Sequence, residues 1–385
     1  MKNVFIIGSK GIPANYGGFE SFVENLTHNK VSEEIKYHVS CMSNNFEVFE
    51  YNKVRCFNIK VPNIGVAKAV YCDIKALTES IRYIRENKIH NPVVYILACR
   101  IGPFINHYKK QIKLLGGNLY VNPDGYEWKR KKWNGIIKKY WKISEYFMVK
   151  HAEVLICDSK NIEKYIRSEY KKLSPNTRFI AYGADTIKSL FGDDAVEVKD
   201  WYRKAGLKFK GYYLVVGRFV PENNFEIMIK EFMKSDTDKD FVLITNVEKN
   251  KFYEKLRLST GFDNDKRIKF VGTVYDFQLL KKIRENAFGY FHGHEVGGTN
   301  PSLLESLGST DLNLLLDVKF NKEVGEDCAL YWTKQTGNLS SLINSADKMT
   351  ADEISEIGNR AKRRINEQYS WERIVGEYEK LFLGS

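Results

Sequence analysis

Short apolar runs alternate with longer amphipathic stretches along the first half of the chain. Seven runs of strand length, rich in β-branched and aromatic residues, cover residues 4–8, 37–42, 54–61, 93–99, 118–121, 153–158 and 178–182. Between them, residues 70–86 give the clearest helical pattern, with apolar side chains on one side and charged ones on the other. This alternation predicts a parallel sheet covered by helices on both faces.

A second series of the same kind follows an acid-rich stretch between about residues 185 and 205. Its strand-length runs cover 212–217, 241–245, 268–272, 288–292 and 312–317. An α/β chain of two Rossmann-like domains is therefore predicted, with boundaries at 1–190 and 191–368. Ligands bind at the carboxyl ends of strands in such sheets, so we expect the two domains to face each other across a cleft. Residues 369–385 form a final helix whose apolar stripe must cover another surface: Trp371, Ile374, Val375, Tyr378, Leu381 and Phe382.

The composition is that of an ordinary globular protein, with 43% hydrophobic and 28% charged residues. The six cysteines never form a CxxC pair, which favours buried thiols over a metal site or disulfides. The apolar stretch near the amino terminus is too short for a signal peptide, and residues 93–99 cover about a third of a membrane span. We therefore expect a soluble, cytoplasmic protein.

The positive charge is concentrated in the first half. The net charge is +12, and residues 101–150 alone carry eleven Lys and Arg against three Asp and Glu. Lysines beside tryptophan and tyrosine favour the headgroup layer of a membrane, so we predict a membrane surface formed by Lys109, Lys110, Lys113, Lys131, Lys132, Lys138, Lys139 and Lys142. A nucleic acid would suit the same charge, but no nucleic-acid motif accompanies it. A plain solvated helix face also stays open.

The stretch HEVGGTNPSLLE, residues 294–305, is built like the entry to an anion-binding helix. Asn300 is placed to cap the helix and Pro301 to begin it, while Gly297 and Gly298 let the backbone approach a ligand. A phosphate would fit this helix end, and Glu305 could then accept hydrogen bonds from a ribose diol. The alternative is a capped helix whose glutamate faces water.

Other candidates follow strands. Gly17 and Gly18 precede a helix in GSKGIPANYGGFE, which lacks the GxGxxG spacing of a dehydrogenase and so disfavours an oxidoreductase. Arg218 follows the run at 212–217 and would clamp a diphosphate. Asp124 could orient an acceptor hydroxyl or could only form a turn. The pair His292 and His294 lacks a third ligand, so no metal is expected.

Three motifs together resemble glycosyltransferase family 4, and more narrowly its bacterial β-1,4-rhamnosyltransferase branch: GIPANYGGFE, VVGR followed by PENN, and HGHEVGGTNPSLLE. The likeness covers essentially the whole chain. It implies the GT-B architecture, with the nucleotide sugar held mainly by the second domain, the acceptor by the first, and the final helix crossing back to the first domain. Enzymes of this family need no metal or other cofactor.

The resemblance also implies roles for individual residues. Glu305 matches the second glutamate of the E-x7-E motif, whereas the first would fall at Gly297 and is missing; Arg218 matches the diphosphate clamp, whose usual lysine is replaced by Asn223. The implied donor site comprises Gly17, Gly18, Arg218, Glu222, Asn223, Gly297, Gly298, Thr299, Asn300, Ser302, Leu303 and Glu305. Glu222, Asn223 and Asn224 are candidates for contacting a 6-deoxy sugar or the acceptor. The implied acceptor site comprises Tyr16, Asp124, Asp158 and Tyr182, with Asp124 or Asp158 orienting the acceptor hydroxyl.

The implied reaction is a retaining hexosyl transfer. It would move L-rhamnose from dTDP-rhamnose to glucose or N-acetylglucosamine on a lipid diphosphate, at the inner face of the cell membrane, during capsule or cell-wall polysaccharide assembly. Two alternatives stay open: a retaining hexosyltransferase of the same family that uses UDP-glucose or a similar donor, and a non-catalytic protein that binds a sugar nucleotide or a nucleic acid.

Overall fold

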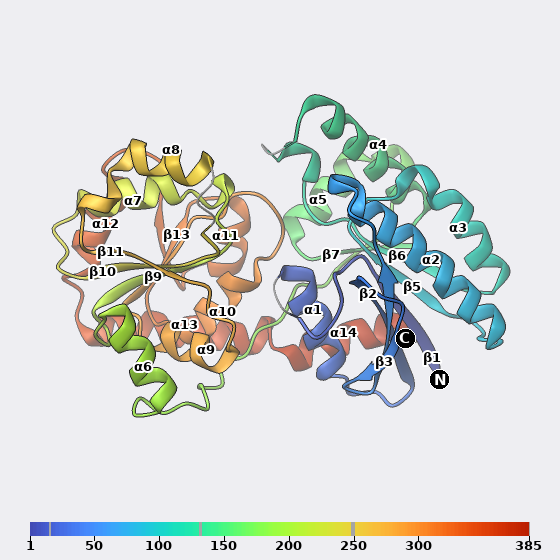
Figure 1. Cartoon of the computed structure of the whole chain (residues 1–385), viewed down its shortest axis with the longest axis horizontal. Coiled ribbons are helices and arrows are strands. Elements are labelled where there is room, and N and C mark those ends of the chain that lie inside the picture. Colours follow the sequence, from blue (N-terminus) through green and yellow to red (C-terminus); the bar gives the residue numbers. More distant parts are fainter. Residues whose placement is uncertain (15–16, 131–132, 248–250, 385) are drawn as a thin grey trace. The chain divides into compact units, whose positions relative to one another are not determined.

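The chain divides into two compact units in the computed structural model, which describes residues 1–14, 17–130, 133–247 and 251–384. The first unit consists of Met1–Gly183 together with Trp371–Ser385, and the second of Ala184–Ser370. Each unit is a twisted sheet with helices packed against it (Figure 1). The second unit is therefore inserted in sequence between two segments of the first.

The described part of the first unit contains an eight-stranded sheet in the order β3-β4-β2-β1-β5-β6-β7-β8. Only the pairing of β3 with β4 is antiparallel within this described sheet. The chain moves outward from β1 in one direction and from β5 in the other, so the topological switch point lies between these two strands. The strands are β1 Lys2–Ile7, β2 Ile35–Ser43, β3 Val48–Tyr51, β4 Val54–Lys60, β5 Val93–Leu97, β6 Asn118–Asn122, β7 Val154–Cys157 and β8 Thr177–Phe179.

Helices follow these strands and bury one apolar face each. In α2, for example, Leu77, Ile81 and Ile84 are buried while Glu79, Arg82 and Glu86 form ion pairs on the exposed side. The central strands β1 and β5 are almost fully buried, as expected for a sheet covered on both faces. The helices are α1 Gly18–His28, α2 Lys68–Glu86, α3 Gly102–Leu114, α4 Gly135–His151 and α5 Lys160–Glu169.

The last helix, α14 (Trp371–Leu383), belongs to the first unit although it follows the second in sequence. Its Tyr378 is fully buried and lies 5.2 Å from Phe22 of α1, measured between ring centroids. The Glu379 carboxylate accepts hydrogen bonds from the backbone N–H groups of Val31 (3.0 Å) and Ser32 (2.9 Å). The prediction that the final helix crosses back to the first domain is confirmed, and its apolar stripe completes that domain's core.

The described part of the second unit contains a six-stranded sheet in the order β11-β10-β9-β12-β13-β14, with every pairing parallel. Its switch point lies between β9 and β12. The strands are β9 Tyr212–Val216, β10 Asp240–Ile244, β11 Ile268–Gly272, β12 Gly289–His292, β13 Asn313–Leu316 and β14 Leu330–Trp332. The helices are α6 Val196–Ala205, α7 Phe225–Met233, α8 Lys251–Thr260, α9 Phe277–Glu285, α10 Pro301–Ser309, α11 Lys319–Gly325, α12 Asn338–Ala346 and α13 Ala351–Gln368.

The α/β prediction of two parallel-sheet domains is confirmed, and each of the twelve strand-length runs overlaps a strand, although the run at 178–182 shares only its first two residues with β8. Two strands were missed because they are short and lack the pattern: β3 is a four-residue edge strand, and β14 has three residues. All six cysteines are buried and unpaired, as expected. Within the described residues, no helix is both long and apolar enough to span a membrane.

Candidate functional site

The switch point of the second unit brings two loops together. One follows β9 and includes Arg218 and a 3-10 turn, Pro221–Asn223; the other follows β12 and leads into α10. Neighbouring parallel strands end at the same edge of the sheet, and ligands bind at this edge where the strand order reverses. The candidate site therefore consists of these two loops.

Two asparagines join the loops. The Asn223 amide nitrogen donates to the Arg218 carbonyl oxygen (2.7 Å), and its oxygen lies 2.8 Å from Nδ1 of His294. The Asn224 amide nitrogen donates to the Gly293 carbonyl oxygen (2.7 Å) and to Glu295 Oε2 (3.2 Å). Both side chains are therefore occupied in holding the loops in place, which leaves them less free to contact a sugar.

The close approach of the loops requires a glycine at position 293. A Cβ atom there would lie 2.4 Å from the Asn223 carbonyl oxygen and 3.1 Å from the sulfur of Met228, both on the loop and helix after β9. Gly297 has a φ of 140°, a left-handed backbone conformation that side chains disfavour. The position at which the resemblance led us to look for a glutamate thus has a backbone conformation that favours glycine.

The first turn of α10 is capped as predicted. The Asn300 side chain accepts a hydrogen bond from the Ser302 N–H (2.9 Å), and the Leu303 N–H donates to the Asn300 carbonyl oxygen (3.0 Å). Ser302 Oγ also donates to the Val216 carbonyl oxygen at the end of β9 (3.0 Å). The N–H groups of Gly297, Gly298 and Asn300 have no acceptor in the described part of the chain. These groups and the helix dipole have the arrangement that suits an anion.

The charges at this edge leave one cation unpaired. Glu295 pairs with Lys334, which follows β14, in a short contact. Arg218 is exposed and has no ion-pair partner among the residues that the structure describes. The Glu295–Lys334 pair is neutral overall, so Arg218 brings an unpaired positive charge to this edge, which suits an anionic ligand.

Glu305 lies one turn inside α10 and pairs with Arg284 of α9, with Oε2 2.5 Å from the guanidinium. The Arg284 side chain is 2% exposed, whereas the Glu305 side chain is 29% exposed. The buried cation therefore holds the carboxylate in position, and the exposed part can still accept a diol.

Glu222 differs from its two asparagine neighbours in having an unused polar atom. Glu222 is 7% exposed, and its Oε1 is buried without a hydrogen-bond partner in the described regions. Thr299, in the other loop, is buried as well. Since buried polar atoms are normally hydrogen-bonded, Glu222 has capacity for a ligand hydroxyl.

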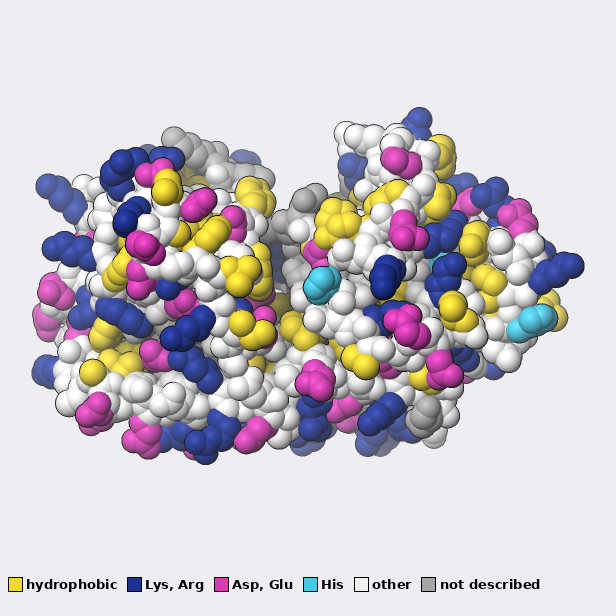
Figure 2. Space-filling model, turned by 90° about the horizontal axis from the view of Figure 1, so that it is seen from below, with side chains coloured by type: hydrophobic (Ala, Val, Ile, Leu, Met, Phe, Trp, Pro, Cys, Tyr) yellow, Lys and Arg dark blue, Asp and Glu magenta, His cyan; other side chains and the backbone are white. Residues whose placement is uncertain are grey.

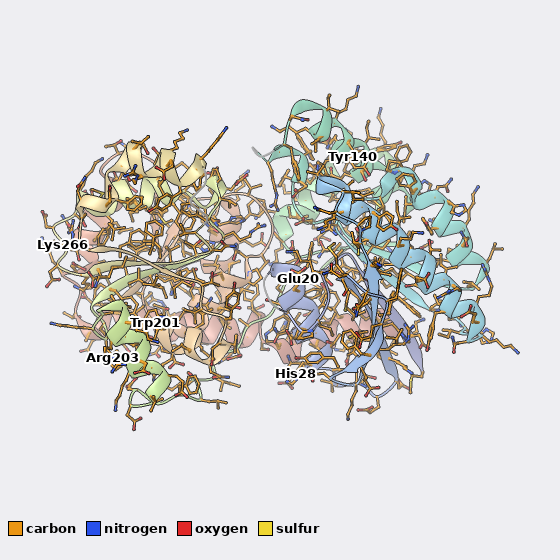
Figure 3. All side chains as sticks on the ribbon, in the orientation of Figure 1. Glu20, His28, Tyr140, Trp201, Arg203 and Lys266 are labelled. Atoms are coloured by element: carbon orange, nitrogen blue, oxygen red, sulfur yellow. The ribbon has the colours of Figure 1, made fainter. Side chains whose placement is uncertain are left out.

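In the first unit, two carboxylates of α1 hold the loop that follows β1. Glu20 (Figure 3) accepts a hydrogen bond from the Lys10 N–H (2.6 Å), and Glu24 accepts one from the Ala14 N–H (2.8 Å). At Gly17, φ is 137° and a Cβ atom would lie 1.9 Å from Glu20 Oε2. Gly17 therefore permits the tight entry to α1, which begins at Gly18; the expected acceptor residue Tyr16 lies outside the described residues.

A buried ion pair occupies the switch point of the first unit. Arg100, after β5, donates to the Gly8 carbonyl oxygen (2.7 Å) and to Asp73 of α2 (3.2 Å). Burial raises the pKa of Asp73 to about 6, against the attraction of Arg100. Tyr140 of α4 (Figure 3) donates to the Arg100 carbonyl oxygen (2.7 Å). The pair ties β1, β5, α2 and α4 together at the sheet edge.

Asp124, after β6, is partly exposed and has a left-handed φ of 56°. Burial raises the pKa of its carboxyl, an effect that the Arg130 and Arg100 cations oppose. Asp158 is 3% exposed and Tyr182 is 5% exposed, with the tyrosine ring 4.9 Å from Phe22. Of these three predicted acceptor residues, Asp124 is therefore the most open to a ligand.

The predicted membrane lysines fall into two groups. Lys109 and Lys113 both pair with Glu153 (3.3 Å each), and Lys142 pairs with Glu145 and Glu169. The ammonium groups of Lys110, Lys138 and Lys139 have no ion-pair partner in the described regions, and Lys131 and Lys132 lie outside those regions.

Apolar side chains are exposed on the same two helices, α3 and α4, which pack together through the hydrogen bond from the Gly102 N–H to Ser144 Oγ (2.7 Å). Ile136 of α4 is 84% exposed, and Leu114 of α3 is 86% exposed. Phe104 and Ile143 are also exposed. On the face drawn in Figure 2, basic, acidic and hydrophobic side chains are interspersed.

Sequence reasoning missed the partners that hold the site. Arg284, Lys334, Arg100 and Asp73 lie in stretches without a motif, and only the fold brings them to the sheet edges. His292 and His294 have ring centroids 6.3 Å apart, and no cluster of three or more His, Cys, Asp or Glu suited to a metal occurs in the described segments.

Residues 1–185 match a family model described as a domain of unknown function, DUF1972. No curated protein matches the chain. Solved structures match it over its whole length at low identity. Sucrose-phosphate synthase from Thermosynechococcus elongatus has a TM-score of 0.79 and 14% identity, with 100% of both chains covered.

Two further structures extend this likeness. The α,α-trehalose 6-phosphate synthase of Burkholderia multivorans has a TM-score of 0.79 and 8% identity, covering 100% of this chain and 96% of its own. HepE of Anabaena, in complex with UDP and glucose, has a TM-score of 0.73 and 11% identity, with both chains covered completely. These identities establish the fold alone, and the chain has the GT-B fold of two Rossmann-like domains.

Proposed function

We propose that this protein is a retaining glycosyltransferase that moves L-rhamnose from dTDP-rhamnose to glucose or N-acetylglucosamine on a lipid diphosphate. The observation that carries the proposal is the anion-binding edge of the second unit. There, unpaired Arg218 and the free N–H groups at the start of α10 follow two strands at the switch point. Such an edge in a GT-B fold suits the diphosphate of a nucleotide sugar.

The donor is held by groups with distinct tasks in this proposal. Arg218 and the N–H groups of Gly298 and Asn300 bind the diphosphate, and Glu305 accepts the ribose hydroxyls. Glu222, with its unused buried oxygen, accepts a sugar hydroxyl. The missing acid at Gly297 favours rhamnose over glucose, because a 6-deoxy sugar offers fewer hydroxyls to bind.

Transfer creates negative charge on the departing diphosphate. Positive groups already in place stabilise that charge without reorganisation, which is the main source of rate enhancement in such a site. The leaving diphosphate takes the proton of the incoming hydroxyl on the same face of the sugar, which gives retention. Asp124, the most open of the candidates, orients the acceptor hydroxyl.

Arg218→Ala tests the clamp. We expect turnover to fall on the order of 100-fold or more, as for loss of one oxyanion-stabilising donor. Arg203→Ala is a matched control in the same unit, because Arg203 is exposed on α6 and pairs only with Asp200 (2.8 Å) in the described structure (Figure 3). Normal turnover by Arg218→Ala would contradict the proposal.

The acceptor's lipid implies a membrane partner, for which the unpaired lysines and exposed apolar side chains of α3 and α4 are suited. Reversing Lys110, Lys138 and Lys139 to Glu removes about 1 kcal/mol of attraction per lysine, so binding to anionic vesicles should weaken roughly 100-fold. The control carries the same reversals at exposed Lys36, Lys53 and Lys60. Equal vesicle binding by both variants would refute this part of the proposal.

The rival donor is UDP-glucose, which the complex of HepE with UDP and glucose makes a specific alternative. Calorimetric titration with dTDP, UDP and GDP separates the two. We expect dTDP to bind most tightly, while tighter binding of UDP would favour the alternative. Absence of binding by all three would contradict the function itself.

A further inference from the structure

His292, the last residue of β12, has an unused polar atom in a buried position. The residue is 4% exposed, and its Nε2 has no hydrogen-bond partner among the residues that the structure describes. Burial lowers the pKa of the imidazole to about 3, with the charge of His294 adding to the effect, so the ring is neutral at pH 7. A neutral imidazole carries one N–H donor.

The ring is linked to the first turn of α10 through Tyr290. Tyr290, two residues earlier on the same face of β12, has its hydroxyl 2.8 Å from Ser302 Oγ and 3.1 Å from the Val216 carbonyl oxygen. The rings of Tyr290 and His292 stack with centroids 6.2 Å apart. His292 thus continues this line of groups to the carboxyl edge, where α10 begins.

Unused buried atoms gather at this edge. Among the described residues of the second unit, six side chains have one, and three of them end or follow adjacent strands: Thr245 after β10, Glu222 after β9 and His292 on β12. Buried polar groups are normally hydrogen-bonded, so a cluster of exceptions indicates partners from outside the chain.

We infer that His292 Nε2–H donates a hydrogen bond to a phosphate oxygen of the nucleoside diphosphate bound at the start of α10. The inference rests on the proposed function, since it names one more residue of the donor site. A neutral donor suits this place because it needs no counter-ion before the ligand arrives, whereas a buried cation would. In this arrangement Arg218 supplies the positive charge, and the hydrogen bond from His292 positions the phosphate oxygen.

The test compares His292→Phe with wild type in calorimetric titrations of the diphosphate that wild type binds best and of the matching nucleoside. We expect about a 10-fold or larger rise in Kd for the diphosphate and less than about a 2-fold change for the nucleoside. A purely structural histidine, or one whose partner is water, would give equal changes for both ligands or none, and either result overturns the inference.

His38→Phe is the matched control. His38 is also buried, with an unused Nδ1 in the described structure and a pKa lowered to about 3, but it lies within β2 and bonds to Asn3 (2.9 Å). Its nucleotide affinity should equal that of wild type. If wild type binds no nucleotide, the proposed function fails rather than the assignment of His292 alone.

A measurement on wild type covers the case in which His292→Phe does not fold. In protein labelled with 15N-histidine, the Nε2 signal of His292, assigned with His292→Gln, should shift when the diphosphate is added and not when the nucleoside is added. An unchanged signal at saturating diphosphate would overturn the inference.

Discussion

Asn224 holds the two loops of the candidate site together, and its replacement should lower the unfolding free energy by more than an average substitution does. The residue directly precedes α7, has a left-handed φ of 55° and is 8% exposed. Its amide nitrogen reaches the Gly293 carbonyl oxygen at 2.7 Å and Glu295 Oε2 at 3.2 Å. Asn224→Ala removes both hydrogen bonds and places alanine in a conformation that asparagine tolerates better.

The loss of stability is the sum of two lost hydrogen bonds and one unfavourable backbone conformation. Each hydrogen bond contributes about 1 kcal/mol net, and left-handed alanine costs about 1 kcal/mol more, so the unfolding free energy should fall by about 3 kcal/mol. For a unit of this size that corresponds to a decrease in Tm of roughly 6–12 °C. Asn224→Gly restores the backbone freedom, so it should lose about 1 kcal/mol less.

Scanning calorimetry of the full chain measures the effect. Asn52→Ala is the control, because Asn52 also has a left-handed φ, of 50°, but is exposed and lies in the turn between β3 and β4. Its Tm should fall by no more than a few degrees. A Tm of Asn224→Ala within about 2 °C of wild type would refute the argument that the amide joins the loops.

Three further outcomes are expected. Gly8→Ala places a Cβ atom 2.3 Å from a carbonyl oxygen at a φ of +105°, and it should lower the unfolding free energy by about 3 kcal/mol or more in urea titrations. Gly65→Ala is the control, because Gly65 has a φ of +56° but open space around it, and it should lower the unfolding free energy by about 1 kcal/mol. Equal losses in the two variants would refute the steric reason. Burial raises the pKa of Asp73 to about 6, so its protonated form contributes roughly 3 kcal/mol to the unfolding free energy below pH 4, and this contribution is lost as the pH rises to about 6. Asp73→Asn should abolish this pH dependence. A stability profile of the variant that runs parallel to that of wild type would contradict the reasoning. Burial also raises the pKa of Asp124 above 3.8, and orienting a hydroxyl requires the ionised carboxylate. The value of kcat/KM should therefore fall as the pH decreases through a value above 3.8. A decrease that occurs only at or below pH 3.8 would count against Asp124.

The spacing of apolar residues along the sequence was enough to predict most of the fold. Twelve strand-length runs and the helix of residues 70–86 could be read from periodicity, because strands and helices of an α/β domain bury apolar faces with distinct spacings. Edge strands β3 and β14 were not predicted, since short strands at the margin bury too little to show a pattern. The capping of α10 by Asn300 was also predicted, because a cap is a local interaction.

The site was less accessible to sequence reasoning, because its partners are distant in the chain. Nothing near Glu305 indicates that Arg284 orients it, and nothing near Glu295 indicates Lys334. Asn223 and Asn224 were proposed as sugar contacts, yet in the structure both side chains bond to backbone or side-chain groups of the site's own loops. Burial also separates Asp124 from Asp158, a distinction that residue type alone does not make.

The central claim is most directly tested by transfer of labelled sugar from donor to lipid. Purified protein is incubated with radiolabelled dTDP-rhamnose, UDP-glucose, UDP-N-acetylglucosamine or GDP-mannose, and with glucose or N-acetylglucosamine on a lipid diphosphate; the label in the lipid fraction is then counted. The account predicts incorporation from dTDP-rhamnose, and a loss on the order of 100-fold with Arg218→Ala. No incorporation from any of the four donors, by folded protein that binds nucleoside diphosphates, would contradict it.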